Sequence, residues 1–254
     1  MSTQMATSAV QTSPNFTNLD ASLQKIEGLR KRINAKKMID EPFFKYIEQN
    51  TLTDEQHKEF FIQYYSIVKT SYRMLAAGIL SSPPEDCDTV EHLVRFLETE
   101  SGGHPNHLGH YLRWAQNFGV TPQDLSSGKP NARSQDFEDT LMNYFSGTDS
   151  LVKQAAQVGL EDCAEVLIDG LDRGYKKYPM NAKTYGYLAI HRLLENDEEG
   201  HSRWAIDSLA TAPELHTRFD EVEKVYQRVY DIFSGVFQGV YETWQARRAA
   251  TANH

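Results

Sequence analysis

Residues 60–77 have the sequence FFIQYYSIVKTSYRMLAA, in which apolar and aromatic side chains recur every three or four positions. This spacing is the period of an amphipathic α-helix, and it extends from about residue 54 to residue 80. Thr53 and Gln56 have the spacing of a capping box at its start, and two prolines at 83 and 84 follow its end. The stretch therefore predicts a long, aromatic-rich helix in an all-α fold.

The same period continues along most of the chain, with few of the alternating β-branched runs that are typical of strands. A chain of 254 residues suits one domain, so we expect a single compact multi-helix bundle of about nine helices. The helical domain is predicted to span residues 19–247, between a polar N-terminal tail (1–18) and a short C-terminal tail (248–254). The other predicted helices are 23–33, 43–47, 89–100, 106–118, 135–145, 149–172, 182–209 and 213–247.

Composition and charge exclude several classes of protein. The formal net charge of -9 disfavours a nucleic-acid-binding protein, because phosphates are bound by a surplus of basic side chains. No run of about eighteen uncharged apolar residues predicts a membrane span, and the polar start of the chain does not have the pattern of a secretory signal. The two cysteines, Cys87 and Cys163, have neither disulfide-framework nor zinc-site spacing. We therefore expect a cytoplasmic protein.

The apolar pattern breaks once, late in the chain. Residues 195–203, ENDEEGHSR, contain no apolar side chain, whereas apolar positions precede and follow them. If the helix over 182–209 is continuous, the stripe through Tyr187 and His191 extends through Glu198 and His201, and titratable groups face the core. Buried carboxylates are costly, so pairing, protonation or metal coordination must compensate. The alternative is a solvated turn between two shorter helices, with Gly200 as the breaker.

A second polar cluster, ESGGHPNH at residues 100–107, places Glu100 at a helix end and His107 at the start of the next helix. Carboxylates and imidazoles from different helices form the mixed oxygen and nitrogen set that suits non-heme iron or manganese. Glu161, in the predicted helix 149–172, is a candidate for a further carboxylate, although a solvated helix face explains it equally well.

Four segments together resemble the heme-oxygenase-like superfamily, which includes TenA, PqqC and the heme-oxygenase-like diiron oxidases and oxygenases. They are FFIQYYSIVKTSYRMLAA (60–77), ETESGGHPNHLGHYLRWAQNFG (98–119), EVLIDGL (165–171) and YLAIHRLLENDEEGHSRWAIDSL (187–209). The resemblance covers about residues 40–245 and implies a heme-oxygenase-like helical bundle.

The diiron members have a recognisable ligand pattern, which the resemblance carries over in part. Glu100, His107 and His201 match ligand positions, and Glu198 takes the place of an Asp. The chain departs from the pattern at three positions. The early helix has Tyr64, Tyr65 and Ser66 where a Glu is expected, Leu194 occupies a His position that His191 could replace, and the middle carboxylate is either Glu161 or Gln157.

The resemblance leaves three outcomes open for the site. One Fe(II) ion binds at Glu100, His107 and His201, a two-His-one-carboxylate arrangement. A second, weaker ion is held by Glu161, Glu198 and His191. Alternatively the pocket holds no metal, as in PqqC-like members, and His and Tyr side chains do acid and base chemistry. Tyr65 and Tyr187 are the candidate catalytic side chains, with Tyr72 and Tyr111 as further candidates to line the pocket.

The resemblance implies a non-heme iron-dependent oxidase or oxygenase that uses dioxygen on a small amino-acid-like or fatty-acid-like metabolite in specialised metabolism. It also implies homodimerisation, which is common in the superfamily. Two alternatives remain open. One is a cofactor-independent or hydrolytic PqqC/TenA-like enzyme, for which Cys163 is the nucleophile to test. The other is a non-catalytic helical binding protein, which the missing early Glu favours.

Overall fold

A computed structural model describes residues 16–103, 105–179, 185–195 and 200–252 of the chain. Across these ranges every regular element is a helix and no strand occurs, which confirms the predicted all-α class. The elements are α1 (Phe16–Ile33), the 3-10 helix η1 (Ala35–Asp40), α2 (Pro42–Gln49), α3 (Asp54–Ser81), α4 (Cys87–Ser101), α5 (His107–Asn117), α6 (Pro122–Ser127), α7 (Ala132–Ser146), α8 (Ser150–Tyr175), α9 (Gly186–Glu195), α10 (His201–Thr211) and α11 (Phe219–Ala252).

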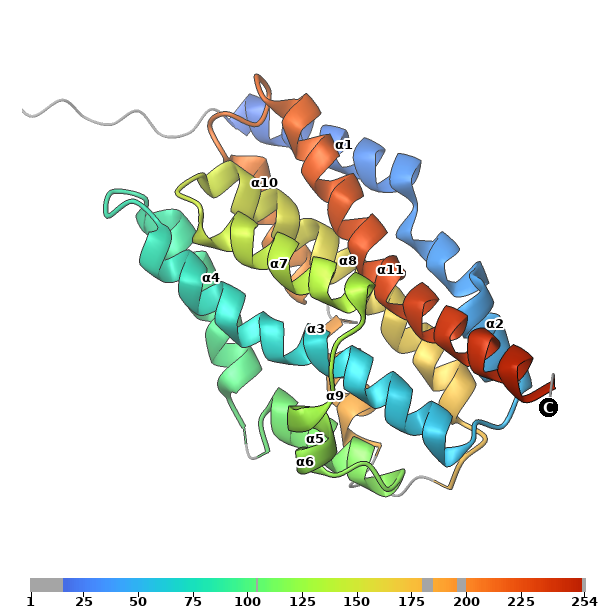
Figure 1. Ribbon diagram of the computed structural model, residues 1–254. Helices are drawn as coiled ribbons and strands as arrows, with labels where there is room; N and C mark the ends of the chain where they lie inside the picture. Colours follow the sequence, from blue (N-terminus) through green and yellow to red (C-terminus); the bar gives the residue numbers. More distant parts are fainter. Residues whose placement is uncertain (1–15, 104, 180–184, 196–199, 253–254) are drawn as a thin grey trace, which may run out of the picture.

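The longest helices form the centre of one bundle. Helix α3 packs against α7 and α4, and α8 packs against α11, which also contacts α7 and α3 (Figure 1). Helices α1 and α2 follow the outside of α8 and α11, whereas α5, α6 and α9 gather around one end of α3 (Figure 1). The described helices do not include one that is both long enough and apolar enough to cross a membrane.

The predicted start of α3 is confirmed in detail. The Thr53 hydroxyl accepts from the Gln56 backbone N–H, and the Gln56 side chain accepts from the Thr53 N–H. These bonds satisfy two amide groups that the first helical turn leaves without an intrahelical partner. At the other end of α3, the buried ammonium group of Lys153 donates to the Gly78 carbonyl and to the Ser82 hydroxyl. A cation at a helix C-terminus is electrostatically favourable, so Lys153 connects α8 to the end of α3.

One ion pair fastens the N-terminal helix to the bundle. The Arg30 guanidinium in α1 donates to both carboxylate oxygens of Asp162 in α8, over 2.7 and 2.6 Å. The Tyr226 hydroxyl of α11 donates to the same carboxylate. Asp162 is 4 % exposed, and these donors compensate for its burial.

The late helices differ from the prediction of continuous helix over 182–209. Helix α9 ends at Glu195 and α10 begins at His201, so the chain forms two helices here. Gly200 has an extended backbone and is the N-cap of α10, so the breaker interpretation of this glycine is the correct one. Residues 196–199, including Glu198, lie outside the described residues.

The last helix begins later and ends later than predicted. Residues 213–217 form turns that bury Leu215, and the Arg218 side chain bonds to Asp149 and Glu214. Helix α11 therefore starts at Phe219, not at residue 213, and it continues to Ala252, beyond the predicted domain boundary at 247. The short elements η1 and α6 have no counterpart among the predicted helices.

Two glycines of α8 allow α2 to approach its backbone closely. A Cβ at Gly170 would lie 2.5 Å from the Phe44 ring, and one at Gly174 would lie 2.6 Å from the Ile47 side chain. Phe44 and Ile47 are both buried. Helix α2 is therefore seated in a groove that exists because these two positions have no side chain.

We predict that Gly170→Ala destabilises the protein by about 1–3 kcal/mol, because the added methyl overpacks a filled core against Phe44. The matched control is Gly28→Ala in α1, where the nearest atom to a Cβ is 3.8 Å away. Removing a glycine from a helix without a clash stabilises it by up to about 1 kcal/mol. Denaturant unfolding followed by circular dichroism measures both changes, and equal effects of the two substitutions would contradict the close packing of α2 on α8.

Candidate active site

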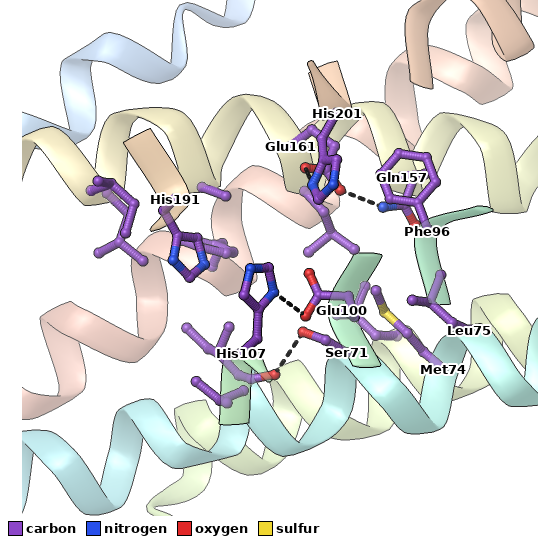
Figure 2. A pocket seen from close by; sticks show the side chains of 18 of the residues that line it. Ser71, Met74, Leu75, Phe96, Glu100, His107, Gln157, Glu161, His191 and His201 are labelled. Atoms are coloured by element: carbon purple, nitrogen blue, oxygen red, sulfur yellow. Dashed lines mark hydrogen bonds and ion pairs between the residues drawn. The ribbon is translucent and has the colours of Figure 1, made fainter. Parts of the chain in front are cut away.

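Five of the predicted ligand residues line one small cavity inside the bundle, although they come from five helices. Figure 2 shows their side chains around this space, which has a volume of about 70 Å³. The remaining wall is largely apolar and includes Val68, Met74, Leu75, Phe96, Leu141 and Leu167. The five residues are Glu100 of α4, His107 of α5, Glu161 of α8, His191 of α9 and His201 of α10.

Glu100 and His107 form the first pair at the cavity. Glu100 Oε2 lies 2.7 Å from His107 Nδ1, and the two side chains are 19 % and 3 % exposed. Burial raises the pKa of Glu100, but His107, His191 and His201 lower it by a larger amount. The net pKa of Glu100 is therefore below its ordinary value. Glu100 is therefore a carboxylate near neutral pH.

The backbone around this pair is held by Tyr72. Its hydroxyl donates to the Glu100 carbonyl over 2.9 Å and accepts from the Leu108 N–H over 2.8 Å. The Asn106 side chain caps α5 by accepting from the Gly109 N–H. These bonds fix the C-terminus of α4 relative to the N-terminus of α5, which positions Glu100 beside His107.

Glu161 and His201 form the second pair. Glu161 Oε2 lies 3.6 Å from His201 Nδ1, and Glu161 Oε1 accepts a hydrogen bond from the Gln157 amide, one turn earlier in α8 (Figure 2). Burial alone lowers the pKa of His201, but Glu161 raises it by more, so the net shift is upward. The structure thus places both alternatives for the middle polar ligand, Glu161 and Gln157, at the cavity, with the carboxylate nearer to His201.

His191 packs against the first pair. Its ring stacks on that of His107 with the centroids 4.7 Å apart, and its Nδ1 lies 2.8 Å from the Tyr187 carbonyl. Nδ1–H donates to that carbonyl, so the lone pair of the neutral ring is on Nε2. Burial, reinforced by His107, lowers the pKa of His191 to about 3. This imidazole is therefore neutral near pH 7.

Several polar atoms at the cavity lack a hydrogen-bond partner within the described protein. They are both ring nitrogens of His107, Nε2 of His201 and the amide oxygen of Gln157. The His107 Nδ1 contact with Glu100 is close, but its direction is not that of a hydrogen bond. Buried polar atoms are nearly always satisfied in proteins, so these atoms are available to a water molecule, an ion or a substrate in the cavity.

The cavity side chains have the donor types of a metal site but not a finished metal geometry. Among the described residues, no three carboxylate, imidazole or thiol groups are arranged to hold a metal ion as they stand. Glu198, the predicted partner of His201, lies outside the described residues.

Helix α3 has no carboxylate at the cavity. All of α3 is described, and its cavity-lining residues are Tyr64, Ile67, Val68, Ser71, Met74 and Leu75. The early helix does not have the Glu of the diiron pattern, and no other carboxylate of α3 takes its place at the cavity. The Ser71 hydroxyl, the most polar group of α3 next to Glu100 in Figure 2, donates to the Ile67 carbonyl.

Of the two candidate catalytic tyrosines, Tyr187 lies at the cavity and Tyr65 does not. Tyr187 lines the cavity, and its hydroxyl lies 2.6 Å from that of Tyr64, which lines it too. Tyr65 instead stacks on Tyr111, and neither ring lines the cavity. A helix turns by about 100° per residue, so adjacent tyrosines face different directions. Tyr64 is the functional candidate that the sequence analysis missed.

The thiol alternative is not supported by the position of Cys163. Its side chain is fully buried and does not line the cavity. Burial raises the pKa of this thiol well above its ordinary value, and the neighbouring carboxylates of Asp162 and Glu41 raise it further. A protonated, inaccessible thiol is a poor nucleophile.

Comparison with known proteins shows which family and which relatives the chain is similar to. The model of the TENA/THI-4/PQQC family matches residues 30–161. The chain is 24 % identical over 207 residues to a protein named 4-aminobenzoate synthase from Chlamydia trachomatis, with 81 % of this chain and 85 % of that protein covered.

Two solved structures share the fold. A TenA homologue from Pseudomonas syringae has a TM-score of 0.71 at 12 % identity, covering 92 % of this chain and 100 % of that one. A domain of unknown function with a heme-oxygenase-like fold from Shewanella denitrificans also has a TM-score of 0.71 at 12 % identity, covering 93 % and 96 %. The fold is thus the heme-oxygenase-like bundle that the resemblance implies.

We predict that His191 makes the metal-free protein less stable in acid. The native pKa is about 3 and the ordinary value is 6.5, so between them the unfolded chain binds a proton that the native state does not. The free energy of unfolding must then fall as the pH falls from 6.5 toward 3, by at most about 1.4 kcal/mol per pH unit from this group.

His191→Gln removes the group, so its unfolding free energy should decline less steeply with acid than that of the wild type. Denaturant unfolding at a series of pH values measures the two slopes. His216→Gln, outside the cavity, controls for the loss of an imidazole, and equal slopes for wild type and His191→Gln would show that His191 is not buried in its neutral form.

Proposed function

The chain belongs to the TENA/THI-4/PQQC family, and on that premise we propose that it is a non-heme iron-dependent oxidative enzyme acting on a small amino-acid-like metabolite. The relatives named 4-aminobenzoate synthase support an oxidative activity in this part of the family. That name describes an aromatic amine with a carboxylate, which favours the amino-acid-like substrate class over the fatty-acid-like class. Dioxygen is the proposed co-substrate.

One observation carries the proposal: carboxylates and imidazoles from five helices meet at one buried cavity, where imidazole nitrogens have no hydrogen-bond partner among the described residues. Nitrogen lone pairs that face a shared cavity beside two carboxylates are what an Fe(II) ion coordinates.

Glu100, His107 and His201 are the residues that would hold one Fe(II) ion. Glu161 and His191, with Glu198, would hold a second and weaker ion. Because no three described groups are arranged for coordination as they stand, side chains must reorient when an ion binds. When bound, Fe(II) in such a two-His-one-carboxylate set supplies the activation of dioxygen.

The chain's own residues provide the rest of the chemistry. The apolar wall, with Phe96, Leu75 and Met74, excludes water from the cavity. Burial raises the pKa of Tyr64 and of Tyr187, so both phenols stay protonated. A phenol of this pair can therefore donate a hydrogen bond to a substrate oxygen, whereas it is a poor general base. On another side of the cavity Glu161 faces His201 Nδ1, and this carboxylate raises the pKa of His201 above its ordinary value.

A second candidate function is a metal-free enzyme of the same family. The Tyr64–Tyr187 hydroxyl pair at the cavity supports it, because hydrogen-bonded phenols can orient a substrate without any metal. In this case the imidazole nitrogens of His107 and His201 would bind the substrate or water. Turnover that survives complete removal of metal distinguishes this candidate from the first.

We predict that protein prepared anaerobically with Fe(II) retains one or two iron ions per chain and consumes dioxygen. Glu100→Gln and His201→Gln should each lose the retained iron, because each removes a donor from the two-His-one-carboxylate set. Metal analysis after desalting measures retention, and an oxygen electrode measures consumption.

The matched control is His92→Gln, which removes a half-buried imidazole of α4 that does not line the cavity. Its iron content should equal that of the wild type. Unchanged iron content in Glu100→Gln and in His201→Gln would show that the metal site as drawn does not exist.

A further inference from the structure

A row of oxidisable aromatic side chains leads from the cavity to the protein surface. Tyr187, in the cavity wall, stacks on Trp114 with the ring centroids 5.3 Å apart and the planes 13° from parallel. Trp114 contacts Tyr175 at 5.0 Å, and Tyr175 contacts Tyr178 at 5.5 Å. Tyr178 is half-buried and lines an open cleft of about 640 Å³, so the row ends at solvent.

We propose that Trp114, Tyr175 and Tyr178 form an electron-transfer route, bridged to the cavity by Tyr187, by which a one-electron oxidising equivalent leaves the cavity for the surface. The oxidant is the iron and dioxygen chemistry of the proposed function, on which the physiological use of the route rests. Indole and phenol rings are the protein side chains that lose an electron most readily, and ring contact at these distances permits fast electron tunnelling.

The proton of Tyr175 has an acceptor, which neutral tyrosine oxidation requires. The Tyr175 hydroxyl lies 3.4 Å from His57 Nδ1, and both groups are buried. Burial lowers the pKa of His57 to about 4, against a weaker opposing effect of Asp54, so the ring is neutral at pH 7. In the tautomer with its proton on Nε2, His57 accepts the phenol proton at Nδ1. His57 also lines the surface cleft.

Each step balances. The Trp114 indole gives one electron to the oxidant in the cavity, through the Tyr187 ring, and becomes a radical cation. Tyr175 reduces that cation, and its phenol proton moves to His57. Tyr178 then returns an electron to Tyr175, which takes its proton back from His57, while the Tyr178 proton passes to water in the cleft. The net change is one electron gained by the oxidant and one hydrogen atom lost by Tyr178.

Among the described residues, the other tyrosines near Trp114 have no such base as a hydrogen-bond partner. Tyr111 donates its hydroxyl to the Phe61 backbone carbonyl, which cannot take up a proton. Tyr64 and Tyr187 bond to each other, and a neutral phenol is also a poor proton acceptor. The Trp114 indole N–H is buried without a hydrogen-bond partner in the described protein. The Trp114 radical cation therefore has no adjacent acceptor for its proton and is not converted into a neutral radical. The Trp114 radical cation is therefore reduced by Tyr175.

The tryptophan nearest to His201 offers no competing exit. The rings of Trp204 and His201 are 5.3 Å apart, but the Arg95 guanidinium lies 3.5 Å from the centre of the Trp204 ring. A cation over the ring disfavours the loss of an electron, because it opposes the positive charge that develops on the indole. Trp204 is thus a natural control residue for the route through Trp114.

The first experiment needs no iron. The chain has three tryptophans, so Trp204→Phe with Trp244→Phe leaves Trp114 as the sole indole. Flash photoionisation of this metal-free protein creates the Trp114 radical, and transient absorption follows its conversion into a tyrosyl radical. We expect a conversion rate that is independent of protein concentration, loss of the conversion in Tyr175→Phe, and its retention in Tyr187→Phe.

Conversion that persists in Tyr175→Phe, or that requires collision between molecules, overturns the route. If the double tryptophan variant does not fold, as judged by circular dichroism, the same signal is obtained as the difference between wild type and Trp114→Phe. Because this arm contains no metal, its outcome is independent of whether the chain binds iron.

The second experiment uses iron-loaded protein exposed to dioxygen with a nitroso spin trap, and peptide mass spectrometry locates the adducts. Wild type and Trp204→Phe should carry the adduct on Tyr178, and Trp114→Phe should lose it while retaining iron. An adduct on Tyr178 in Trp114→Phe contradicts the route. Absence of iron and of every adduct in the wild type, together with intact photochemical transfer, counts against the proposed function alone.

Discussion

The structure depends on neutralising charge inside an apolar bundle. Glu100, Glu161 and three imidazoles are inside a core where unpaired charge is very costly. Each carboxylate faces a histidine, Glu100 with His107 and Glu161 with His201, and His191, stacked on His107, remains neutral. The helix breaks follow from this requirement, because α5 and α10 both begin at a cavity histidine, so short helices bring imidazoles to carboxylates on longer ones.

The fold and the carboxylate and imidazole side chains of the cavity could be predicted, because they leave local signals in the sequence. The 3.6-residue period gives the helices, and its interruptions at 100–107 and 195–203 contain Glu100, His107 and His201, which line the cavity. The positions of Tyr64 and Ser71 could not be predicted in this way, because a helix in the centre of a bundle is apolar on several faces and its pattern does not specify which face meets the cavity. The late start of α11 depends on Arg218, whose partner Asp149 is distant in sequence.

The aromatic side chains have two roles at different distances from the cavity. Close to it, Tyr64 and Tyr187 direct hydroxyl groups inward, and farther away Trp114 and Tyr175 are packed ring against ring. Composition alone cannot separate these roles, since a tyrosine of the core and a tyrosine of a reactive pair have the same sequence signature. The two kinds of tyrosine differ in whether a neighbour such as His57 can accept the phenol proton. His57 lies in α3, about two turns from Tyr64.

The accessibility of Lys153 to a reagent measures how often the bundle opens. Its ammonium group is sealed under the last turn of α3, bonded to Gly78 and Ser82. An amine-directed acylating reagent can reach it only while α3 and α8 are apart, unlike the lysines on the outside of the molecule. The rate at which this one lysine is acylated therefore reports how often the middle of the bundle opens, and a slower rate on addition of a small molecule would reveal that the molecule binds the closed bundle, before any reaction is known.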